Sequence, residues 1–172
     1  MHHTRQSPMR PTDLVLTPTH LRFLGRRLPC AIGRAGRTGA KREGDGATPR
    51  GVHDIVGMLY RPDRLPRPAD WAVPIRPGDL WSDDPAHEDY NLMVRTPYAH
   101  SAESLRRPDP LYDLILITDW NWPRARRGGG SAIFVHVWRR PRYPTAGCIA
   151  LSRTDLLWIA PRLRHGVKLI VP

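Results

Sequence analysis

Two residues near the C-terminal end, His136 and Cys148, have the types and surroundings that covalent catalysis requires. His136 lies in an apolar run, Ser131-Ala-Ile-Phe-Val-His-Val-Trp138, and Cys148 follows in Pro144-Thr-Ala-Gly-Cys-Ile-Ala-Leu151. A thiol becomes a nucleophile when an imidazole takes its proton, and neighbouring main-chain N–H groups can hold the negative charge of a carbonyl under attack. The pattern predicts Cys148 as nucleophile and His136 as its base, paired as thiolate and imidazolium.

The same residues resemble the signature of the YkuD-type L,D-transpeptidases, which cross-link peptidoglycan through a cysteine. In that family a strand histidine precedes a Ser/Thr-His-Gly-Cys-apolar box, and here His136 precedes Thr145-Ala-Gly-Cys-Ile149. The stretch from Lys41 to Gly51, with Thr48-Pro49 inside it, resembles the family's Gly/Thr-Pro-x-Gly loop. Tyr112-Asp113 before an apolar run and Gly130-Ser131 before the histidine strand also fit. The resemblance covers residues 13–171.

The resemblance implies a predominantly β fold and a two-step reaction. Cys148 attacks the amide carbonyl of a peptidoglycan stem peptide and a D-amino acid leaves; an amine of a second stem, or water, then takes the acyl group from the thioester. The carbonyl of Val137 is implied as the acceptor that orients the ring of His136. The N–H groups of Ala146, Gly147 and Cys148 are expected to stabilise each oxyanion.

Candidates for substrate binding lie close to this box. Thr145 is expected to shape the turn or to bond the substrate, and Tyr112 is placed in the substrate site. Arg139, Arg140 and Arg142 are all candidates for binding a diaminopimelate carboxylate, because a guanidinium binds a carboxylate through two parallel hydrogen bonds.

The chain departs from the family pattern at three points. Ala146 stands where the family usually has histidine, the interval from His136 to Cys148 is slightly short, and Ala150 stands where many members carry Asn or Arg. The first change keeps the main-chain N–H, so the oxyanion site can survive while the substrate is held differently. The last change removes a plausible substrate contact.

Three functions follow as hypotheses. The first is an L,D-transpeptidase of the periplasm or cell wall, with a role in cell shape and with Cys148 open to acylation by carbapenems. The second is an L,D-carboxypeptidase that trims stem peptides, with water in place of the amine. The third is a non-catalytic domain that binds the cell wall or another polyanion. The sequence does not mark the acceptor site, so it does not separate the first two.

Composition narrows the class of protein further. With 172 residues, 19 prolines and 14 glycines, the chain predicts one domain of short strands and long loops over residues 13–172, after a disordered tail over 1–12. The net charge of +11 suits polyanions or reflects GC-rich coding. The arginines are dispersed along the chain and do not form the basic stripe with interleaved aromatic residues that is typical of nucleic-acid binding, so no nucleic-acid partner is predicted. The sequence has no apolar segment long enough to predict a membrane span, and no signal peptide is visible in it. No cofactor is implied, and the oligomeric state is left open.

Other features have less specific interpretations. Residues 41–51 lack the Gly-Lys-Ser/Thr end of a phosphate-binding loop, which favours a glycine-rich turn beside the active site. The acidic residues of 83–89 lack a regular ligand spacing, so no metal is predicted. Cys30 lies in an apolar stretch typical of a buried, inert thiol. The tryptophans at 71, 81, 120 and 122 suit either a substrate groove or a core.

Hydrophobic patterning predicts a mainly β, sandwich-like fold with one or two short helices. The predicted strands cover residues 13–17, 20–24, 27–32, 51–60, 111–118, 131–138 and 166–171. A short helix is predicted over 101–105, and a second over 156–163 after a capping box that Ser152 begins, with Pro161 shortening it. Residues 33–50, 61–91 and 124–130 are predicted as loops.

Overall fold

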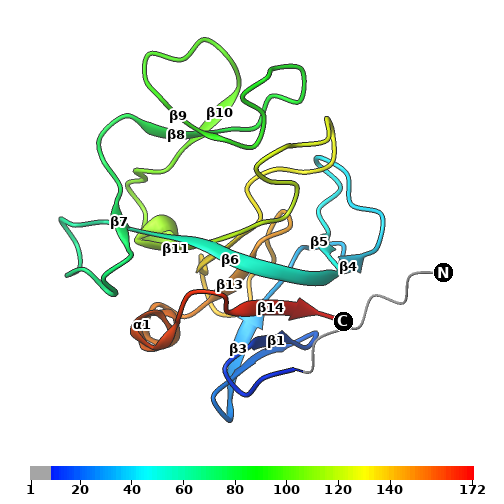
Figure 1. The fold of residues 1–172 in the computed structure, drawn as a ribbon, viewed down its shortest axis with the longest axis vertical. Coiled ribbons are helices and arrows are strands. Elements are labelled where there is room, and N and C mark those ends of the chain that lie inside the picture. The colour runs from blue at the N-terminus through cyan, green and yellow to red at the C-terminus, as the bar shows by residue number, and fades with distance from the viewer. Residues whose placement is uncertain (1–8) are drawn as a thin grey trace.

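The computed structural model describes residues 9–172, and most of its strands join one nine-stranded sheet in the order β11-β12-β13-β3-β2-β1-β14-β6-β7 (Figure 1). The strands of this sheet are β1 (Leu14–Leu16), β2 (His20–Phe23), β3 (Arg26–Ala31), β6 (Gly51–Tyr60), β7 (Val73–Pro74), β11 (Leu114–Thr118), β12 (Phe134–Val137), β13 (Ile149–Leu151) and β14 (Lys168–Val171). The prediction of a mainly β protein is confirmed.

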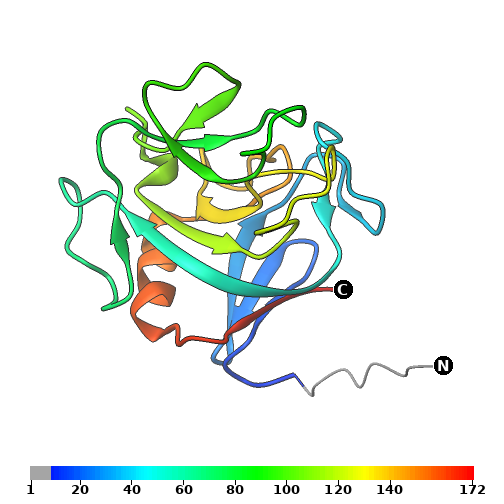
Figure 2. The same cartoon turned by 45° about the horizontal axis from the view of Figure 1, so that its top comes forward.

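The sheet closes on itself through its longest strand. β6 pairs with β14 along Gly51–Asp54 and with β11 along Ile55–Tyr60, both antiparallel. A strand of ten residues is long enough to serve two neighbours in succession, and a bulge between Ile117 and Thr118 adjusts the register. Figure 2 shows β6 crossing the molecule between these partners. Closure gives both β11 and β14 a neighbour on each side, and it gives the predicted sandwich a barrel-like form.

Both faces of β11 are buried, and each face contributes to a different apolar cluster. Leu114 and Leu116 belong to the larger cluster inside the barrel, and Ile115 and Ile117 belong to the smaller one outside it. Successive side chains of a strand point to opposite faces, so a strand buried on both sides reads as a continuous apolar run. The smaller cluster lies beneath a second sheet that covers this side of the barrel.

This second sheet has the order β10-β8-β9 and consists of β8 (Asp79–Ser82), β9 (Met93–Arg95) and β10 (Ala102–Ser104). It corrects two predictions. The segment 61–91 is not a plain loop, because it contains β7 and β8. The helix predicted over 101–105 is wrong, because Ala102–Ser104 form a strand in which Glu103 pairs opposite Trp81. Leu105, directly after this strand, is fully buried in the smaller cluster. A five-residue helix is too short to be stable by itself, so the strand pairing outweighs it.

Smaller differences concern where elements begin and end. The predicted loop 33–50 contains the two-residue pair β4 (Arg37–Thr38) and β5 (Thr48–Pro49). The predicted strand 111–118 starts at Leu114, because a 3-10 turn over Pro110–Tyr112 precedes it. β12 covers only Phe134–Val137 of the predicted 131–138.

The C-terminal helix follows its local signals. Ser152 accepts a hydrogen bond from the N–H of Asp155 and begins α1 (Arg153–Ile159), whose Leu156 and Ile159 are fully buried. Pro161 lies in a 3-10 turn over Ala160–Arg162 that ends the helix, as predicted. No helix within residues 9–172 is both long and apolar enough to cross a bilayer.

The predicted N-terminal tail is described only in part, because residues 1–8 lie outside the described residues. Within the described part, the N–H of Arg10 donates to Asp13 Oδ2 at 2.8 Å, and the carbonyl of Pro11 accepts from the N–H of Leu24. Ordered structure therefore begins before Asp13.

Candidate active site

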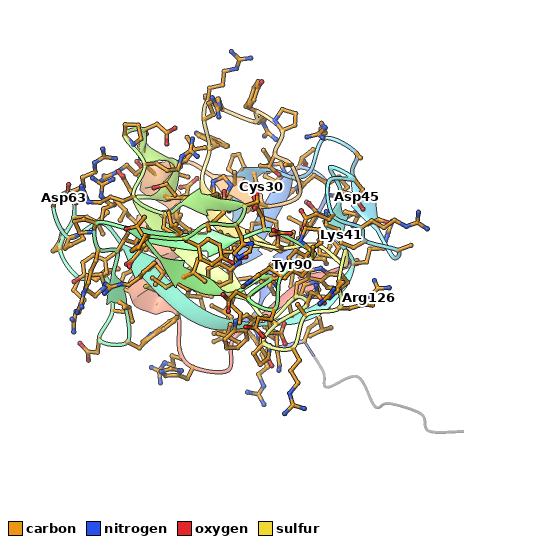
Figure 3. The ribbon with its side chains drawn as sticks, turned by 90° about the horizontal axis from the view of Figure 1, so that it is seen from above. Cys30, Lys41, Asp45, Asp63, Tyr90 and Arg126 are labelled. Atoms are coloured by element: carbon orange, nitrogen blue, oxygen red, sulfur yellow. The ribbon has the colours of Figure 1, made fainter. Side chains whose placement is uncertain are left out.

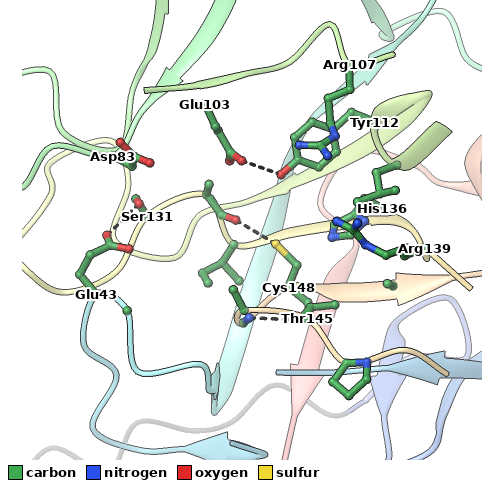
Figure 4. Close-up of a pocket in the computed structure, with 18 of the residues that line it drawn as sticks. Glu43, Asp83, Glu103, Arg107, Tyr112, Ser131, His136, Arg139, Thr145 and Cys148 are labelled. Carbon is green, nitrogen blue, oxygen red and sulfur yellow. Dashed lines mark hydrogen bonds between the residues drawn. The ribbon is translucent and has the colours of Figure 1, made fainter. Parts of the chain in front are cut away.

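One pocket of about 590 Å³ opens between the second sheet, the loop after β4 and the turn before β13 (Figure 4). Both predicted chemical groups, the thiol of Cys148 and the imidazole of His136, line it. Its lining is Lys41, Glu43, Gly44, Asp83, Glu103, Arg107, Leu111, Tyr112, Ser131, Ala132, Ile133, His136, Arg139, Tyr143, Pro144, Thr145, Ala146, Gly147, Cys148 and Ala150.

Strand pairing brings the two groups together. β12 and β13 are parallel neighbours, with His136 opposite Ala150. Cys148 lies two positions before Ala150, so by the alternation of a strand it points to the same face of the sheet. The N–H of Phe134, two positions before His136, donates to Cys148 Sγ at 3.4 Å. Ala150, one of the departures from the family pattern, is fully buried opposite His136 and lines the pocket.

The thiol of Cys148 is protonated in this arrangement. Sγ donates to the carbonyl of Ala132 at 3.0 Å. Burial raises the pKa of the Cys148 thiol to about 12; the N–H of Phe134 and the charge of Lys41 act in the opposite direction. A thiolate would lose the bond to Ala132 and face its carbonyl oxygen, so ionisation requires the sulfur to turn away from it.

His136 is neutral as well. Its Nδ1 lies 2.8 Å from the carbonyl oxygen of Val137, which can only accept, so Nδ1 carries the proton and Nε2 is left as the base. Burial lowers the pKa of His136 to about 4. The resting pair is therefore thiol and imidazole, and the thiolate–imidazolium pair expected from the sequence is wrong for the resting state.

The turn that carries Cys148 is held from both sides. Thr145 Oγ1 accepts from the N–H of Gly147 at 3.1 Å and donates to the carbonyl of Cys148 at 2.6 Å, while Thr48 Oγ1 donates to the carbonyl of Gly147 at 2.8 Å. Gly147 has φ +149°, and a Cβ there would lie 2.9 Å from the carbonyl oxygen of Ala47. Only glycine fits this position.

The loop after β4 places a buried charge behind this turn. Lys41 is buried and pairs with Asp45, 2.5 Å from Nζ to Oδ1, and the two lie side by side in Figure 3. A Cβ on Gly147 would lie 3.2 Å from Lys41 Nζ, so the ammonium is close to the cysteine turn. The sequence indicated a glycine-rich turn beside the active site here, and gave no sign that its lysine is buried.

Some of the predicted substrate-binding residues line the pocket and others do not. Arg139 lines the pocket. Arg140 and Arg142 are not among the lining residues. The guanidinium carbon of Arg140 lies 4.3 Å from the ring centroid of Tyr143, and Arg142 donates a hydrogen bond to the carbonyl of Thr19. Tyr112 does line the pocket, with its ring edge-on to that of His136 at 5.4 Å between centroids.

Sequence reasoning missed the second sheet's contribution to the site. Glu103 and Asp83 come from β10 and from the end of β8, and Glu43 comes from the loop after β4. Arg107 lies over the ring of Tyr112 at 5.4 Å. Among residues 9–172, no group of His, Cys, Asp and Glu is arranged to hold a metal ion.

The remaining predictions on cysteine and tryptophan have mixed outcomes. Cys30 and Cys148 are both free, and Cys30 is buried opposite Leu151. Trp81 is a core residue, bonded through Nε1 to Asn91. Trp71, Trp120 and Trp122 are half-buried and do not line the pocket.

This mainly β barrel therefore holds in one pocket the two side chains, a cysteine and a histidine, that cysteine-dependent acyl transfer uses. The comparison with protein families makes this specific. Residues 20–171 match the model of YkuD, the L,D-transpeptidase catalytic domain, and the chain therefore belongs to that family. The resemblance found in the sequence is confirmed over nearly the whole chain. No curated protein sequence matches the chain.

Proposed function

We propose that this protein is a cell-wall L,D-transpeptidase that forms peptidoglycan cross-links through a thioester on Cys148. The observation that carries the proposal is the pocket shared by the sulfur of Cys148, which directly precedes β13, and the ring of His136 on the adjacent parallel strand β12. Membership of the YkuD family supports peptidoglycan as the substrate. The site of action follows from the substrate: the periplasm or cell wall.

The first half-reaction uses the neutral pair. As Cys148 Sγ turns from Ala132 and attacks the amide carbonyl of a stem peptide, Nε2 of His136 takes its proton. The N–H groups of Ala146 and Cys148 then stabilise the oxyanion, because the N–H of Gly147 is already bonded to Thr145. The imidazolium returns the proton to the leaving amine, which gives the thioester and a free D-amino acid.

The second half-reaction decides between transpeptidase and carboxypeptidase. An amine of a second stem restores the thiol and forms a cross-link, whereas water restores the thiol and leaves a shortened stem. Of the three arginines predicted to bind a substrate carboxylate, Arg139 is the one that lines the pocket, and Thr145 acts by holding the turn. The carboxylates of Glu43, Asp83 and Glu103 also line the pocket and can bind an ammonium group. This favours an amine over water as the acyl acceptor.

Purified sacculi separate these outcomes. The proposed enzyme produces cross-linked muropeptide dimers, a carboxypeptidase produces shortened monomers, and a wall-binding protein changes neither. Cys148→Ser is expected to abolish the products without loss of fold. Intact mass spectrometry after incubation with a carbapenem should show one adduct on Cys148. A Cys148→Ser variant with full activity contradicts the proposal.

A further inference from the structure

Acyl transfer to an amine removes two protons from the acceptor, and the site described above holds one base. An alkyl amine is an ammonium ion at neutral pH. One proton has to leave before its nitrogen can attack the thioester, and a second leaves as the new amide forms. Nε2 of His136 can take one of them. That nitrogen is needed for the second proton, which has to reach the departing sulfur of Cys148, so the first proton requires another acceptor.

Glu103 is placed to take the first proton. It lies on β10, lines the pocket that contains Cys148, and accepts a hydrogen bond from the hydroxyl of Tyr112 at 3.0 Å. Figure 4 shows this carboxylate and hydroxyl together on the pocket side that faces the sulfur of Cys148. A carboxylate accepts at two oxygens, so the bond from Tyr112 leaves Glu103 able to accept from a ligand.

The surroundings of Glu103 bring the pKa of its carboxyl close to neutral pH. Burial raises its pKa to about 7; the hydrogen bond from Tyr112 and the charge of Arg107 lower the pKa, and the carboxylates of Asp83 and Glu43 raise it. A base is most effective when its pKa lies near the working pH. The neighbouring carboxylates also attract a cation to this wall of the pocket, away from Arg139.

We propose that Glu103 is a catalytic residue that binds the ammonium of the acyl acceptor and removes its first proton, while Tyr112 acts as a positioning residue for its carboxylate. This inference rests on the proposed transpeptidase function. The acceptor that it specifies is a primary amine that arrives protonated.

The protons and bonds then balance. Glu103 carboxylate takes one proton from the ammonium and becomes a carboxylic acid. The free amine attacks the thioester carbonyl, the C–N bond forms, and the tetrahedral oxyanion collapses with cleavage of the C–S bond. His136 takes the second proton from the nitrogen and passes it to the departing sulfur of Cys148. Glu103 finally releases its proton to solvent.

A pair of acceptors tests this role. Muropeptide monomers carry an amine that is protonated at neutral pH, whereas hydroxylamine is largely unprotonated there and needs no first deprotonation. With Glu103→Gln, we expect dimer formation to fall about 100-fold while hydroxamate formation from the same donor stays within about twofold of wild type. In the wild type, dimer formation should rise with pH through the region near 7, and Glu103→Gln should lack this rise.

Two controls complete the design. Glu88→Gln makes the same change of charge at an exposed carboxylate of the same region, outside the pocket, and should keep the wild-type rates. Tyr112→Phe should lower dimer formation less than Glu103→Gln and should shift its pH profile.

The outcomes are distinguishable by product. Equal loss of dimers and hydroxamate in Glu103→Gln, or dimers at the wild-type rate, overturns the role of Glu103 and leaves the proposed function standing. A wild-type protein that forms no acyl-enzyme by mass spectrometry overturns both.

Discussion

The resting thiol of Cys148 should be unusually unreactive, and its response to pH should show this directly. With a pKa of about 12, the thiolate fraction at pH 7 is about 10⁻⁵, against a few per cent for a free cysteine with a pKa of about 8.5. Alkylation of Cys148 by iodoacetamide should therefore be about 1,000-fold slower than that of a cysteine peptide at pH 7. The rate should rise about tenfold per pH unit from pH 6 to 9.

Intact mass spectrometry of a Cys30→Ala variant follows this reaction at a single thiol. Cys30 is buried and outside the pocket, so the substitution leaves the site in place. A rate that is constant between pH 5 and 8 would show a thiolate already formed beside a charged His136, and would refute the reasoning from burial. His136→Gln should slow acylation by substrate about 100-fold or more, because the attacking sulfur then lacks its base.

Three further predictions concern the surroundings of this thiol. Gly147→Ala is expected to cost about 1–3 kcal/mol in urea unfolding, because its Cβ would lie 2.9 Å from a carbonyl oxygen, and to slow acylation; an unchanged midpoint would contradict the close packing. Lys41→Met should raise the pKa of Cys148 and slow its alkylation at pH 8, whereas Asp45→Asn should not raise that pKa; equal slowing in both variants would indicate a purely structural ion pair. The lowered pKa of His136 stabilises the fold fully above about pH 6.5, and about 3 kcal/mol of this is lost as pH falls towards 4. Unfolding of the wild type and of His136→Gln at pH 7 and 4.5 measures the loss, which should be smaller in the variant.

Much of the barrel was predictable because its strands carry local signals. Residues 51–60, 111–118 and 166–171 are apolar runs between turn residues, and each contains a strand of the structure. The helix after Ser152 follows from its cap and from Pro161. These signals act within a few residues of the chain, so they can be recognised without knowing which strands pair with one another.

The second sheet was not predictable for the opposite reason. Residues 101–105 have no strong preference, and Ala102–Ser104 become a strand only because β8 offers hydrogen bonds and the smaller apolar cluster takes up Leu105. Glu103 lines the pocket for the same reason, because it lies on β10, which pairs with β8. The pairing spans about twenty residues of chain, a distance over which no local pattern operates.

The sequence by itself determined the family and predicted the reacting pair, because the types and spacing of His136 and Cys148 are local and chemically specific. Only the tertiary structure decided the protonation of that pair, which depends on burial. It also placed Arg139, but not Arg140 or Arg142, in the lining of the pocket, together with Lys41 and Glu103. Charge and desolvation depend on what surrounds a group in three dimensions, and those surroundings come from strands far apart in the chain.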